Sequence, residues 1–464
     1  MQQYNHPTAL VLLGATGDLA KRKLLPAMYD LYVDGALPAH WQLIGAATTE
    51  HDDASFRQFV RELLGHERPR LEEFVSRLRY VTGDFADDAF YHRVRSTVFA
   101  FNEYIGQCAN VLYYLAVPPH LYGMMFEQLA RTKSLQICDD TTAWARLLVE
   151  KPFGNNLTTA HALEAQLCQL FADEQIYRID HYLAKSEIEN VLALRFGNRI
   201  FMHLWQAEAI ESIDVMLHED LEVADRGAFY DGVGALRDVG QNHLLQILSL
   251  LLMEPADIRD AVAFRAARAR VVDDLRFTST VVPPVRGQYD GYRSVSGVKP
   301  DSTTETFFRF GINSVDPKWL SVPITVSAGK ALAGEAQEAR ITFRPAALAT
   351  IGMTCPVGTH TNVLRIIFRP ESRLSMQLAT REPGHALSVQ THEYDLVTER
   401  TTTNEPEAYA RVLLDCIRGE QMRFVSREEV AAAWRLMETV DRELAARPLS
   451  SYPIGADGAT IGEN

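Results

Sequence analysis

The sequence predicts two domains: a doubly wound α/β domain, followed by an α+β domain with a large, mainly antiparallel sheet. A chain of 464 residues is too long for one ordinary hydrophobic core. In the first part, short apolar runs alternate with helical patterns, which is typical of parallel strands joined by crossover helices. Between residues 270 and 397 strand patterns follow one another without a long helix, which favours an antiparallel sheet. We expect the first domain to span residues 1–176 and the second residues 177–464.

The first domain is expected to begin with a buried strand. A short apolar run ends at Gly14, as expected of a strand that is covered on both faces. Apolar residues recur at helical spacing between residues 56 and 64 and predict an amphipathic helix. The other elements expected here are a helix at residues 24–32 and strands at residues 8–13, 42–47, 110–117 and 147–149.

The second domain is expected to contain one helix that is buried on all sides. Residues 236–253 are apolar around nearly the whole helical circumference. The expected strands lie at residues 306–310, 322–326, 339–343, 364–368 and 374–378. Two further helices are expected near residues 405–418 and 426–445.

The composition argues against some classes of partner. A net charge of −14 argues against nucleic acid, which binds basic patches. The longest apolar stretch, residues 247–253, is far too short for a membrane span, and the first residues do not resemble a signal peptide. We therefore expect a cytoplasmic protein without nucleic-acid or membrane partners. The five cysteines lack metal-ligand spacing, so we expect buried, reduced thiols and no metal site.

A glycine-rich turn separates the first expected strand from the helix that follows it. Small residues there let the backbone approach a pyrophosphate, and the helix N-terminus contributes N–H groups and positive potential. The spacing is Gly-x-x-Gly-x-x-Ala, not the usual Gly-x-Gly-x-x-Gly, and a tight turn without a ligand is the alternative. The position between strand and helix favours a Rossmann-like dinucleotide site. Its residues are Gly14, Ala15, Thr16, Gly17, Asp18 and Leu19.

The residues after the second expected strand normally select between NAD and NADP, through an acid for the ribose or an arginine for the additional phosphate. Here they are Thr48, Thr49 and Glu50, with no arginine. The two hydroxyl groups suit either cofactor, whereas Glu50 would repel a 2′-phosphate. We expect NAD, or the use of both cofactors.

Residues 179–185 hold an unusual density of polar chemistry. Asp180 is suited to orient a base, and His181, Tyr182 and Lys185 are suited to bind a phosphate group. Packing alone does not require these residue types so close together. The segment therefore suggests a sugar-phosphate site.

His243 lies in the expected apolar helix, where a histidine is commonly a core residue with satisfied hydrogen bonds. Oxidation of a sugar hydroxyl, however, requires a base that takes the O–H proton as hydride leaves the carbon. An imidazole suits this task, and a carboxylate on its second nitrogen stabilises the charged form. Asp180 is a candidate for that carboxylate.

Several motifs, in the same order, resemble the glucose-6-phosphate dehydrogenase family. The match spans roughly residues 8–434, almost the whole chain. The resemblance implies that hydride passes from C1 of a hexose 6-phosphate to NAD or NADP, giving a 1,5-lactone without a metal. The motifs are Gly-Ala-Thr-Gly-Asp-Leu-Ala from Gly14, Glu-Lys-Pro-Phe-Gly from Glu150, Tyr-Arg-Ile-Asp-His-Tyr-Leu from Tyr177, Gly-Ala-Leu-Arg-Asp from Gly234 and Gln-Asn-His-Leu-Leu-Gln from Gln241.

The resemblance also implies individual roles. His243 would be the base and Asp180 its partner, Lys151 would lie between cofactor and sugar, and Tyr114 would line the cofactor side. The family assembles as dimers or tetramers through the large sheet, so we expect a homodimer or homotetramer. The implied ligands of the 6-phosphate are His181, Tyr182 and Lys185, and those of the sugar hydroxyls are Glu219, Asp231 and Lys330.

Two alternatives stay open. Sugar and cyclitol dehydrogenases with a Glu-Lys-Pro motif oxidise substrates without a phosphate, and the Lys151 equivalent assists their catalysis. The phosphate-binding set His181, Tyr182 and Lys185 argues against this alternative. A catalytically idle binding paralogue is the second alternative, and the retention of Asp180, Lys151 and His243 argues against it.

Several positions depart from the family pattern. Thr48 replaces an arginine near the 2′-phosphate, and Ser327 replaces an arginine, which argues against a second, structural NADP site. Glu335 replaces a basic residue that helps to hold the substrate, and Arg369 replaces a glutamine. These changes favour a shifted specificity, for instance for a 2-amino hexose 6-phosphate whose ammonium group is attracted by an additional acid. The remaining departures are Ser186 and Gln206.

Overall fold

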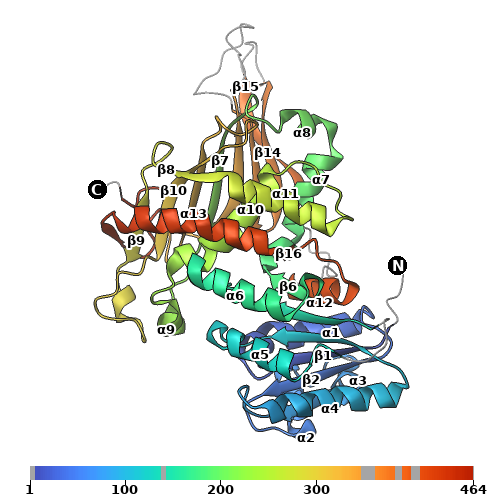
Figure 1. Cartoon of the computed structure of the whole chain (residues 1–464). Helices are drawn as coiled ribbons and strands as arrows, with labels where there is room; N and C mark the ends of the chain where they lie inside the picture. The colour runs from blue at the N-terminus through green and yellow to red at the C-terminus, as the bar shows by residue number, and fades with distance from the viewer. Residues whose placement is uncertain (1–5, 137–142, 346–360, 382–388, 399–407, 463–464) are drawn as a thin grey trace. The chain divides into compact units, whose positions relative to one another are not determined.

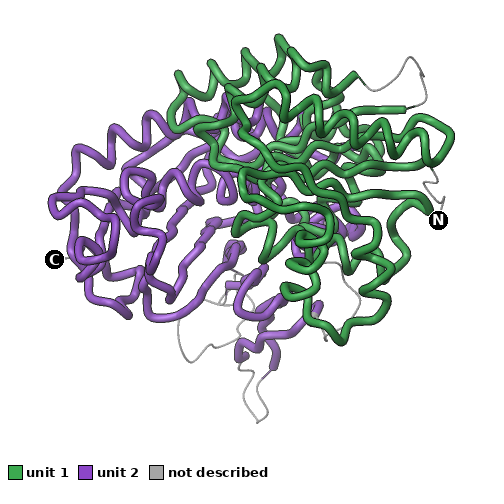
Figure 2. Tube along the Cα trace, turned by 90° about the horizontal axis from the view of Figure 1, so that it is seen from below, with its two compact units in different colours: residues 1–184, 257–265, 404–427 green, residues 185–256, 266–403, 428–464 purple. Residues whose placement is uncertain are grey.

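The computed structural model describes residues 6–136, 143–345, 361–381, 389–398 and 408–462. The chain forms two compact units, shown in different colours in Figure 2. Unit 1 comprises residues 1–184, 257–265 and 404–427, and unit 2 comprises residues 185–256, 266–403 and 428–464. Two later segments of the chain thus return to the N-terminal unit.

Unit 1 is built on a seven-stranded sheet in the order β16-β6-β5-β4-β1-β2-β3. All neighbours are parallel except β16, which pairs antiparallel with β6. Strand order reverses around β1, as in doubly wound folds. The bounds are β1 Thr8–Leu13, β2 Trp41–Ala47, β3 Leu78–Thr82, β4 Asn110–Leu115, β5 Ala145–Val149, β6 Ile176–Ile179 and β16 Phe424–Val425.

Helices cover the unit 1 sheet, as Figure 1 shows. The wholly apolar strands β1 and β4 are buried at every position, because helices lie over both faces of a parallel sheet. A π-helix at Ala20–Leu24 opens the first crossover. The α-helices are α1 Leu25–Val33, α2 Asp53–Leu64, α3 Leu71–Ser76, α4 Asp88–Ile105, α5 Tyr122–Arg131, α6 Leu157–Leu170 and α12 Ala408–Arg418.

Unit 2 contains a ten-stranded sheet in the order β15-β14-β13-β12-β7-β11-β10-β9-β17, with β8 paired to β10. Its pairs are antiparallel except β7 with β11 and β17 with β9. The bounds are β7 Ile210–His218, β8 Leu275–Thr278, β9 Val285–Tyr289, β10 Phe307–Ser314, β11 Ile324–Gly329, β12 Ala336–Phe343, β13 Val363–Arg369, β14 Arg373–Arg381, β15 Val389–Thr398 and β17 Leu449–Tyr452.

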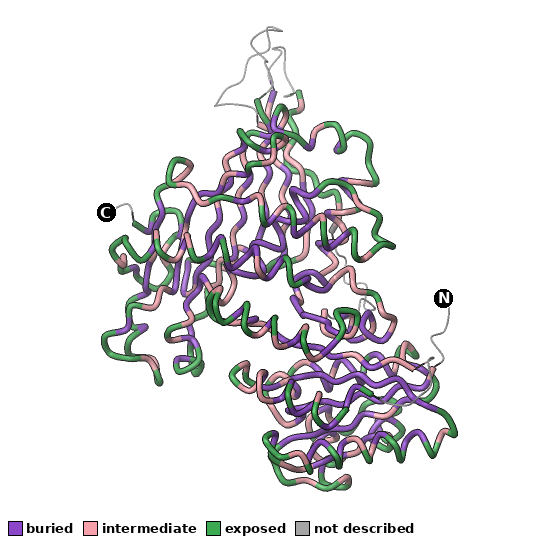
Figure 3. The backbone as a smooth tube through the Cα atoms, in the orientation of Figure 1, coloured by how far each residue is buried: buried purple, intermediate pink, exposed green. Residues whose placement is uncertain are grey.

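The helices of unit 2 include a long π-helical segment at Leu236–Leu244, which continues directly into α10. Gly240 lets this segment approach the sheet, because a Cβ atom there would come within 2.9 Å of the Phe308 ring of β10. In both units the buried residues concentrate in the strands (Figure 3). The α-helices are α7 Ser186–Gly197, α8 Arg199–Leu204, α9 Gly227–Tyr230, α10 Leu245–Leu252, α11 Ala261–Asp274 and α13 Arg427–Ala445.

The predicted fold class is confirmed: a parallel Rossmann-like sheet and a large, mainly antiparallel sheet. One expected element differs in form, because residues 236–253 are not one regular α-helix but a π-helix followed by α10. The expectation of reduced thiols is wrong for Cys108, which is disulfide-bonded, whereas Cys168 and Cys416 are free. Among the described residues, no helix combines the length and hydropathy of a membrane span.

Candidate functional site

Four neighbouring strands of unit 1 run parallel and end at one edge of the sheet. These are β1, β4, β5 and β6. Gly14 follows β1, Lys151 lies two residues beyond β5, and Asp180 follows β6 directly. In open α/β sheets, ligands bind at this carboxyl edge. The topology therefore gathers the glycine-rich turn, Lys151 and Asp180 at the edge where a dinucleotide site is expected.

The glycine-rich turn has the shape of a phosphate cradle. Gly14 has a φ of +91°, and a Cβ atom there would overlap the carbonyl oxygen of Ala116. The Gly17 amide donates to the Gly14 carbonyl at 2.9 Å and closes the turn. Ala15 is fully buried, whereas Asp18 is exposed. Only glycine fits at position 14, and the turn brings bare backbone to the surface, which suits a pyrophosphate. Thr16, Gly17 and Leu19 are half-buried and complete the turn.

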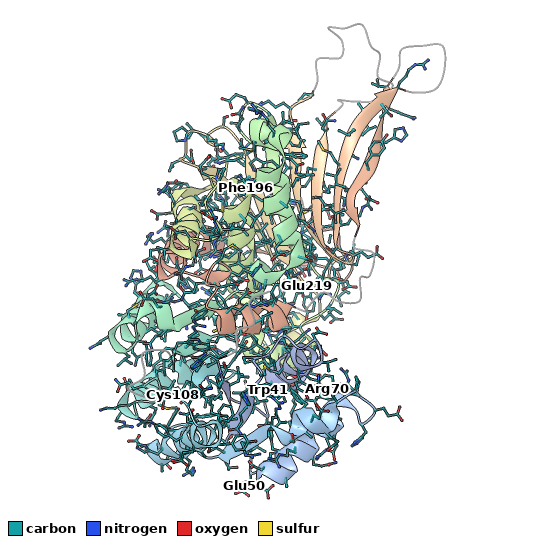
Figure 4. All side chains as sticks on the ribbon, turned by 90° about the vertical axis from the view of Figure 1, so that its right-hand side faces the viewer. Trp41, Glu50, Arg70, Cys108, Phe196 and Glu219 are labelled. Carbon is teal, nitrogen blue, oxygen red and sulfur yellow. The ribbon has the colours of Figure 1, made fainter. Side chains whose placement is uncertain are left out.

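The segment after β2 carries hydroxyl groups and an acid at the surface. Thr48, Thr49 and Glu50 are exposed, and Figure 4 labels Glu50. The hydroxyl groups of Thr16 and Thr49 are 2.9 Å apart and join this segment to the glycine-rich turn. The Tyr80 hydroxyl donates to the Thr49 carbonyl at 2.8 Å. The segment is thus held beside the turn, where the ribose of a dinucleotide is expected.

Tyr114 of β4 and Glu150 beside β5 form a buried pair. The Tyr114 hydroxyl donates to the Glu150 carboxylate at 2.5 Å. Burial raises the pKa of Glu150 to about 7, against the hydrogen bond from Tyr114 and the charge of Lys151, which lower it. The Tyr122 hydroxyl donates to the Glu150 carbonyl at 3.1 Å. These contacts fix the backbone that carries Lys151, which is half-buried and precedes a cis peptide bond to Pro152.

The turn after β6 orders the polar segment that begins at Asp180. Asp180 is buried, and one carboxylate oxygen accepts the Tyr182 amide at 3.0 Å. His181 is half-buried and stacks on Tyr409 of α12 at 5.6 Å between ring centroids. Tyr182 is buried, and Lys185, the first residue of unit 2, is half-buried. A helix from near the C-terminus therefore holds the histidine in place.

His243 lies in the π-helix of unit 2. It is 2% exposed, and its backbone amide donates to the Asn242 side chain at 2.7 Å. The half-buried Glu305 accepts the Leu236 amide through its carboxylate at 3.1 Å at the helix start. π-Helical turns within α-helices are frequent at functional sites. The helix is thus anchored at its N-terminus and held close to β10 through Gly240.

Glu219 and Lys330 meet at the ends of two parallel neighbours. Glu219 follows β7 and Lys330 follows β11, and the two strands pair in register up to His218 and Gly329. The side chains form an ion pair, and Figure 4 labels Glu219. The Lys330 ammonium also lies 5.8 Å from the centre of the Tyr230 ring. The structure therefore brings together two of the predicted sugar ligands of unit 2.

The carboxylate of Asp231 is heavily hydrogen-bonded within unit 2. It accepts from the hydroxyl groups of Ser302 and Thr304, the latter at 3.0 Å, and from the Lys299 amide at 3.3 Å. Burial raises the pKa of Asp231, but these hydrogen bonds outweigh it and the net pKa is lowered. A fourth donor, the Tyr292 hydroxyl, lies at 3.4 Å. Asp231 thus holds a loop and stays ionised.

Two departures from the family pattern contact each other. Arg369 ends β13, and its guanidinium lies 3.6 Å from the Glu335 carboxylate, which precedes β12. The Gln337 side chain also donates to Glu335 at 3.3 Å. The Lys185 ammonium lies 5.8 Å from the ring of Phe368, next to Arg369 in sequence. The acid at position 335 is therefore neutralised by a cation that sequence analysis treated as a separate change.

The comparisons with known proteins bear on both units. A family model described as "Glucose-6-phosphate dehydrogenase, NAD binding domain" matches residues 11–190, and one described as "Glucose-6-phosphate dehydrogenase, C-terminal domain" matches residues 192–463. The chain belongs to the glucose-6-phosphate dehydrogenase family. It is a glucose-6-phosphate dehydrogenase-like, NAD(P)-dependent dehydrogenase, and its first domain is the NAD(P)-binding domain.

Full-length relatives and solved structures support the same family assignment. Glucose-6-phosphate 1-dehydrogenase of Aggregatibacter actinomycetemcomitans is 34% identical, over 98% of this chain and 94% of that protein. A glucose-6-phosphate dehydrogenase in complex with its substrate glucose 6-phosphate superposes with a TM-score of 0.88 at 30% identity, covering 98% of this chain and 96% of that one. Glucose-6-phosphate 1-dehydrogenase from Mycobacterium avium gives a TM-score of 0.82 at 30% identity, covering 97% of this chain and 95% of that one.

A more distant likeness concerns the fold alone. Aldose-aldose oxidoreductase from Caulobacter crescentus has a TM-score of 0.52 at 12% identity, covering 95% of this chain and 98% of that one. Its similarity shows that the two-part architecture is shared beyond the glucose-6-phosphate dehydrogenase family.

Three residues that contact the surroundings of the predicted site were not singled out from the sequence. Glu150 was noted only as part of the Glu-Lys-Pro motif, although its carboxylate is buried against Tyr114. Tyr230 borders Lys330, and its position beside Asp231 was the available signal. Glu305 caps the π-helix from a distant part of the chain, and no local pattern points to it.

Proposed function

We propose that the chain oxidises C1 of a hexose 6-phosphate, with NAD or NADP as hydride acceptor, to a 6-phospho-1,5-lactone. Residues 1–176 would hold the dinucleotide, and residues 177–464 would bind the sugar and form the oligomer, a homodimer or homotetramer. The observation that carries the proposal is that unit 1 holds a phosphate-cradle turn and unit 2 holds the Glu219–Lys330 pair, each in the unit where the family pattern requires it. The match of family models across nearly the whole chain supports it.

In this proposal His243 accepts the proton of the C1 hydroxyl group while hydride leaves C1. Its side chain is buried, so the imidazolium that forms requires a compensating charge. Asp180 supplies that charge as the partner of His243, and it is fixed by the Tyr182 amide. Bound NAD(P)+ supplies the nicotinamide that receives the hydride. Lys151 holds the sugar and the cofactor face to face, and the Tyr114–Glu150 pair positions it.

One set of residues would bind the phosphate group of the sugar, and another set would bind its hydroxyl groups. His181, Tyr182 and Lys185 would bind the 6-phosphate, for which imidazole, phenol and ammonium groups are suitable donors. Glu219 and Lys330 form an acceptor and donor pair that suits vicinal hydroxyl groups. Asp231 would act beside them, although its carboxylate also holds the loop at residues 299–304.

The ion pair of Glu335 and Arg369 favours glucose 6-phosphate over a 2-amino analogue. An unpaired Glu335 would attract the ammonium group of glucosamine 6-phosphate. Arg369 already neutralises that carboxylate and leaves an exposed guanidinium on its outer side, at 58% exposure of the side chain. The pair carries no net charge, so no uncompensated acid opposes the binding of an anionic sugar at Lys185.

The cofactor is proposed to be NAD, or both NAD and NADP. The exposed Thr48, Thr49 and Glu50 provide hydroxyl groups and an acid where the ribose is expected, and no arginine replaces them. A 2′-phosphate would meet the charge of Glu50 at close range.

The deciding experiment measures absorbance of the reduced nicotinamide with purified protein. Glucose 6-phosphate and glucosamine 6-phosphate are each tested with NAD and with NADP, and free glucose serves as the control without a phosphate. We expect reduction with glucose 6-phosphate, at least tenfold higher kcat/KM than with glucosamine 6-phosphate, and none with glucose. Turnover of free glucose at the same efficiency would favour the non-phosphorylated alternative. Cofactor binding without turnover of any sugar phosphate would favour the idle paralogue.

A further inference from the structure

A hollow of about 500 Å³ lies in unit 1 at the edge of the sheet where β2 and β3 begin. We infer that this pocket, here named the strand-start pocket, binds a small anion that carries an aromatic ring, of the class of aryl or nucleoside phosphates. Pockets of this volume hold small organic ligands. Its walls come from the residues that lead into β2 and β3 and from one face of α4. The side chains that matter here are His40, Arg77, Arg79, Thr97, Phe101 and Tyr104.

The strand-start pocket is separate from the dinucleotide edge. β2 begins at Trp41, a residue of the pocket that Figure 4 labels, and ends at Ala47, beside the glycine-rich turn. Successive residues of a strand advance by about 3.3 Å, so the two ends of β2 are roughly 20 Å apart. A ligand at the start of β2 therefore cannot be part of a dinucleotide bound at its end.

The charge of the pocket is opposite to that of the chain. Its described lining contains two arginines and one histidine and no aspartate or glutamate, although the chain carries a net charge of −14. Arg77 forms no ion pair with any described residue, and one of its terminal nitrogens donates to the Ala39 carbonyl at 3.2 Å. The Arg79 guanidinium lies 3.4 Å from Asp53, which lies outside the lining. Arg77 therefore keeps donors for an anion at the pocket wall.

Aromatic side chains line the same pocket. Phe101 is buried in the wall, whereas Tyr104 is 85% exposed at the rim. The Arg77 guanidinium lies 5.2 Å from the centre of the Trp41 ring. The exposed Tyr104 and the cation Arg77 line the same pocket, so a ring can stack on the tyrosine while its phosphate meets the charge.

A matched pair of substitutions on α4 tests the inference. Thr97 lines the pocket and Ser96 does not, although both are polar residues on the same helix. Thr97→Glu introduces a negative charge into the pocket, and Ser96→Glu introduces the same charge outside it. Binding of phenyl phosphate is measured by isothermal titration calorimetry with the protein saturated with its nicotinamide cofactor. We expect Thr97→Glu to weaken binding at least tenfold and Ser96→Glu to change it less than twofold.

A second variant separates the ring from the phosphate. Tyr104→Ala should weaken phenyl phosphate at least threefold and leave inorganic phosphate unchanged, and its exposure makes a folding defect unexpected. No binding of phenyl phosphate, or binding that is equal in the two glutamate variants, overturns the inference. Phenyl phosphate that binds at the sugar-phosphate site instead would bind equally to the two glutamate variants. Equal affinities for phenyl phosphate and inorganic phosphate overturn the assignment of an aromatic ligand. Thermal unfolding of each variant confirms that it is folded.

Discussion

The Tyr114 hydroxyl donates a 2.5 Å hydrogen bond to the carboxylate of Glu150, and both side chains are buried between β4 and β5. Burial raises the pKa of Glu150 to about 7 and the pKa of Tyr114 well above its ordinary value. Glu150 therefore changes its charge close to neutral pH, next to Lys151 in the chain. Strongly shifted pKa values cluster at functional sites.

The first prediction concerns the pH dependence of stability. A carboxyl group whose pKa rises from 4.5 to about 7 on folding binds its proton more tightly in the folded chain. Its contribution to the free energy of unfolding is complete below pH 4.5 and is lost as pH rises towards 7, by at most about 3 kcal/mol. Glu150→Gln should remove this dependence. Urea unfolding of both proteins at pH 5 and pH 8 measures the difference.

Comparing the parent protein with Glu150→Gln removes the contribution of other buried acids to the pH dependence of stability. Asp415, whose pKa burial raises to about 6, is present in both proteins and drops out of the difference. An identical pH dependence in the two proteins would show that Glu150 does not titrate in this window.

The second prediction concerns the base. His243→Asn should lower kcat by roughly 10²–10⁴, the usual contribution of general base catalysis. The dissociation constants of sugar and cofactor should change less than threefold, because asparagine preserves a polar group of similar size. Initial rates and equilibrium binding measure the two quantities separately. Normal turnover by the variant would remove His243 from the mechanism.

The third prediction concerns the phosphate. Lys185→Ala should raise KM for glucose 6-phosphate at least tenfold with a smaller change in kcat, because a charged hydrogen bond to the phosphate is lost. Lys133→Ala, which removes an exposed lysine of unit 1, is the control and should leave KM unchanged. Equal KM values for the two variants would contradict the assigned role of Lys185.

The fourth prediction concerns the paired departures. Glu335→Lys alone places a cation beside Arg369, and Arg369→Gln alone leaves Glu335 without its ion partner. Arg369→Gln should raise KM for glucose 6-phosphate severalfold and lower KM for glucosamine 6-phosphate, whereas Glu335→Lys, which restores a basic residue near the anionic sugar, should lower KM for glucose 6-phosphate. In the double variant the two effects should not simply add, since residues in contact are not independent. Additive effects would show that the two residues act independently.

The fifth prediction concerns the cradle. Gly14→Ala and Gly35→Ala both place a side chain at positive φ, +91° and +66° respectively. This strain alone costs roughly 1–2 kcal/mol. Gly14→Ala also forces overlap with the Ala116 carbonyl, so it should cost about 1–3 kcal/mol more and weaken cofactor binding. Urea unfolding and cofactor titration measure both effects, and retention of full cofactor affinity by Gly14→Ala would argue against the turn as the pyrophosphate site.

Local patterns were sufficient for the wholly apolar strands and for the glycine-rich turn. The apolar run at residues 8–13 coincides with β1 from end to end, because a strand buried on both faces requires apolar residues at every position. β7 was not anticipated, although buried and half-buried residues alternate from Ile213 to His218, as expected of a strand with one covered face. The π-helical form of residues 236–244 was not anticipated either, since hydrophobic periodicity does not distinguish a π-turn from an α-turn.

Sequence by itself determined the family, the fold class and the residue types that carry the chemistry, because these depend on motifs and on hydrophobic periodicity along the chain. Only the tertiary structure decided which side chains meet. Glu335 and Arg369 lie 34 positions apart and pair because β12 and β13 are antiparallel neighbours. Glu305 caps the helix of His243 from 69 positions away. Contacts between distant residues depend on strand register and burial, and neither is encoded in any local stretch of sequence.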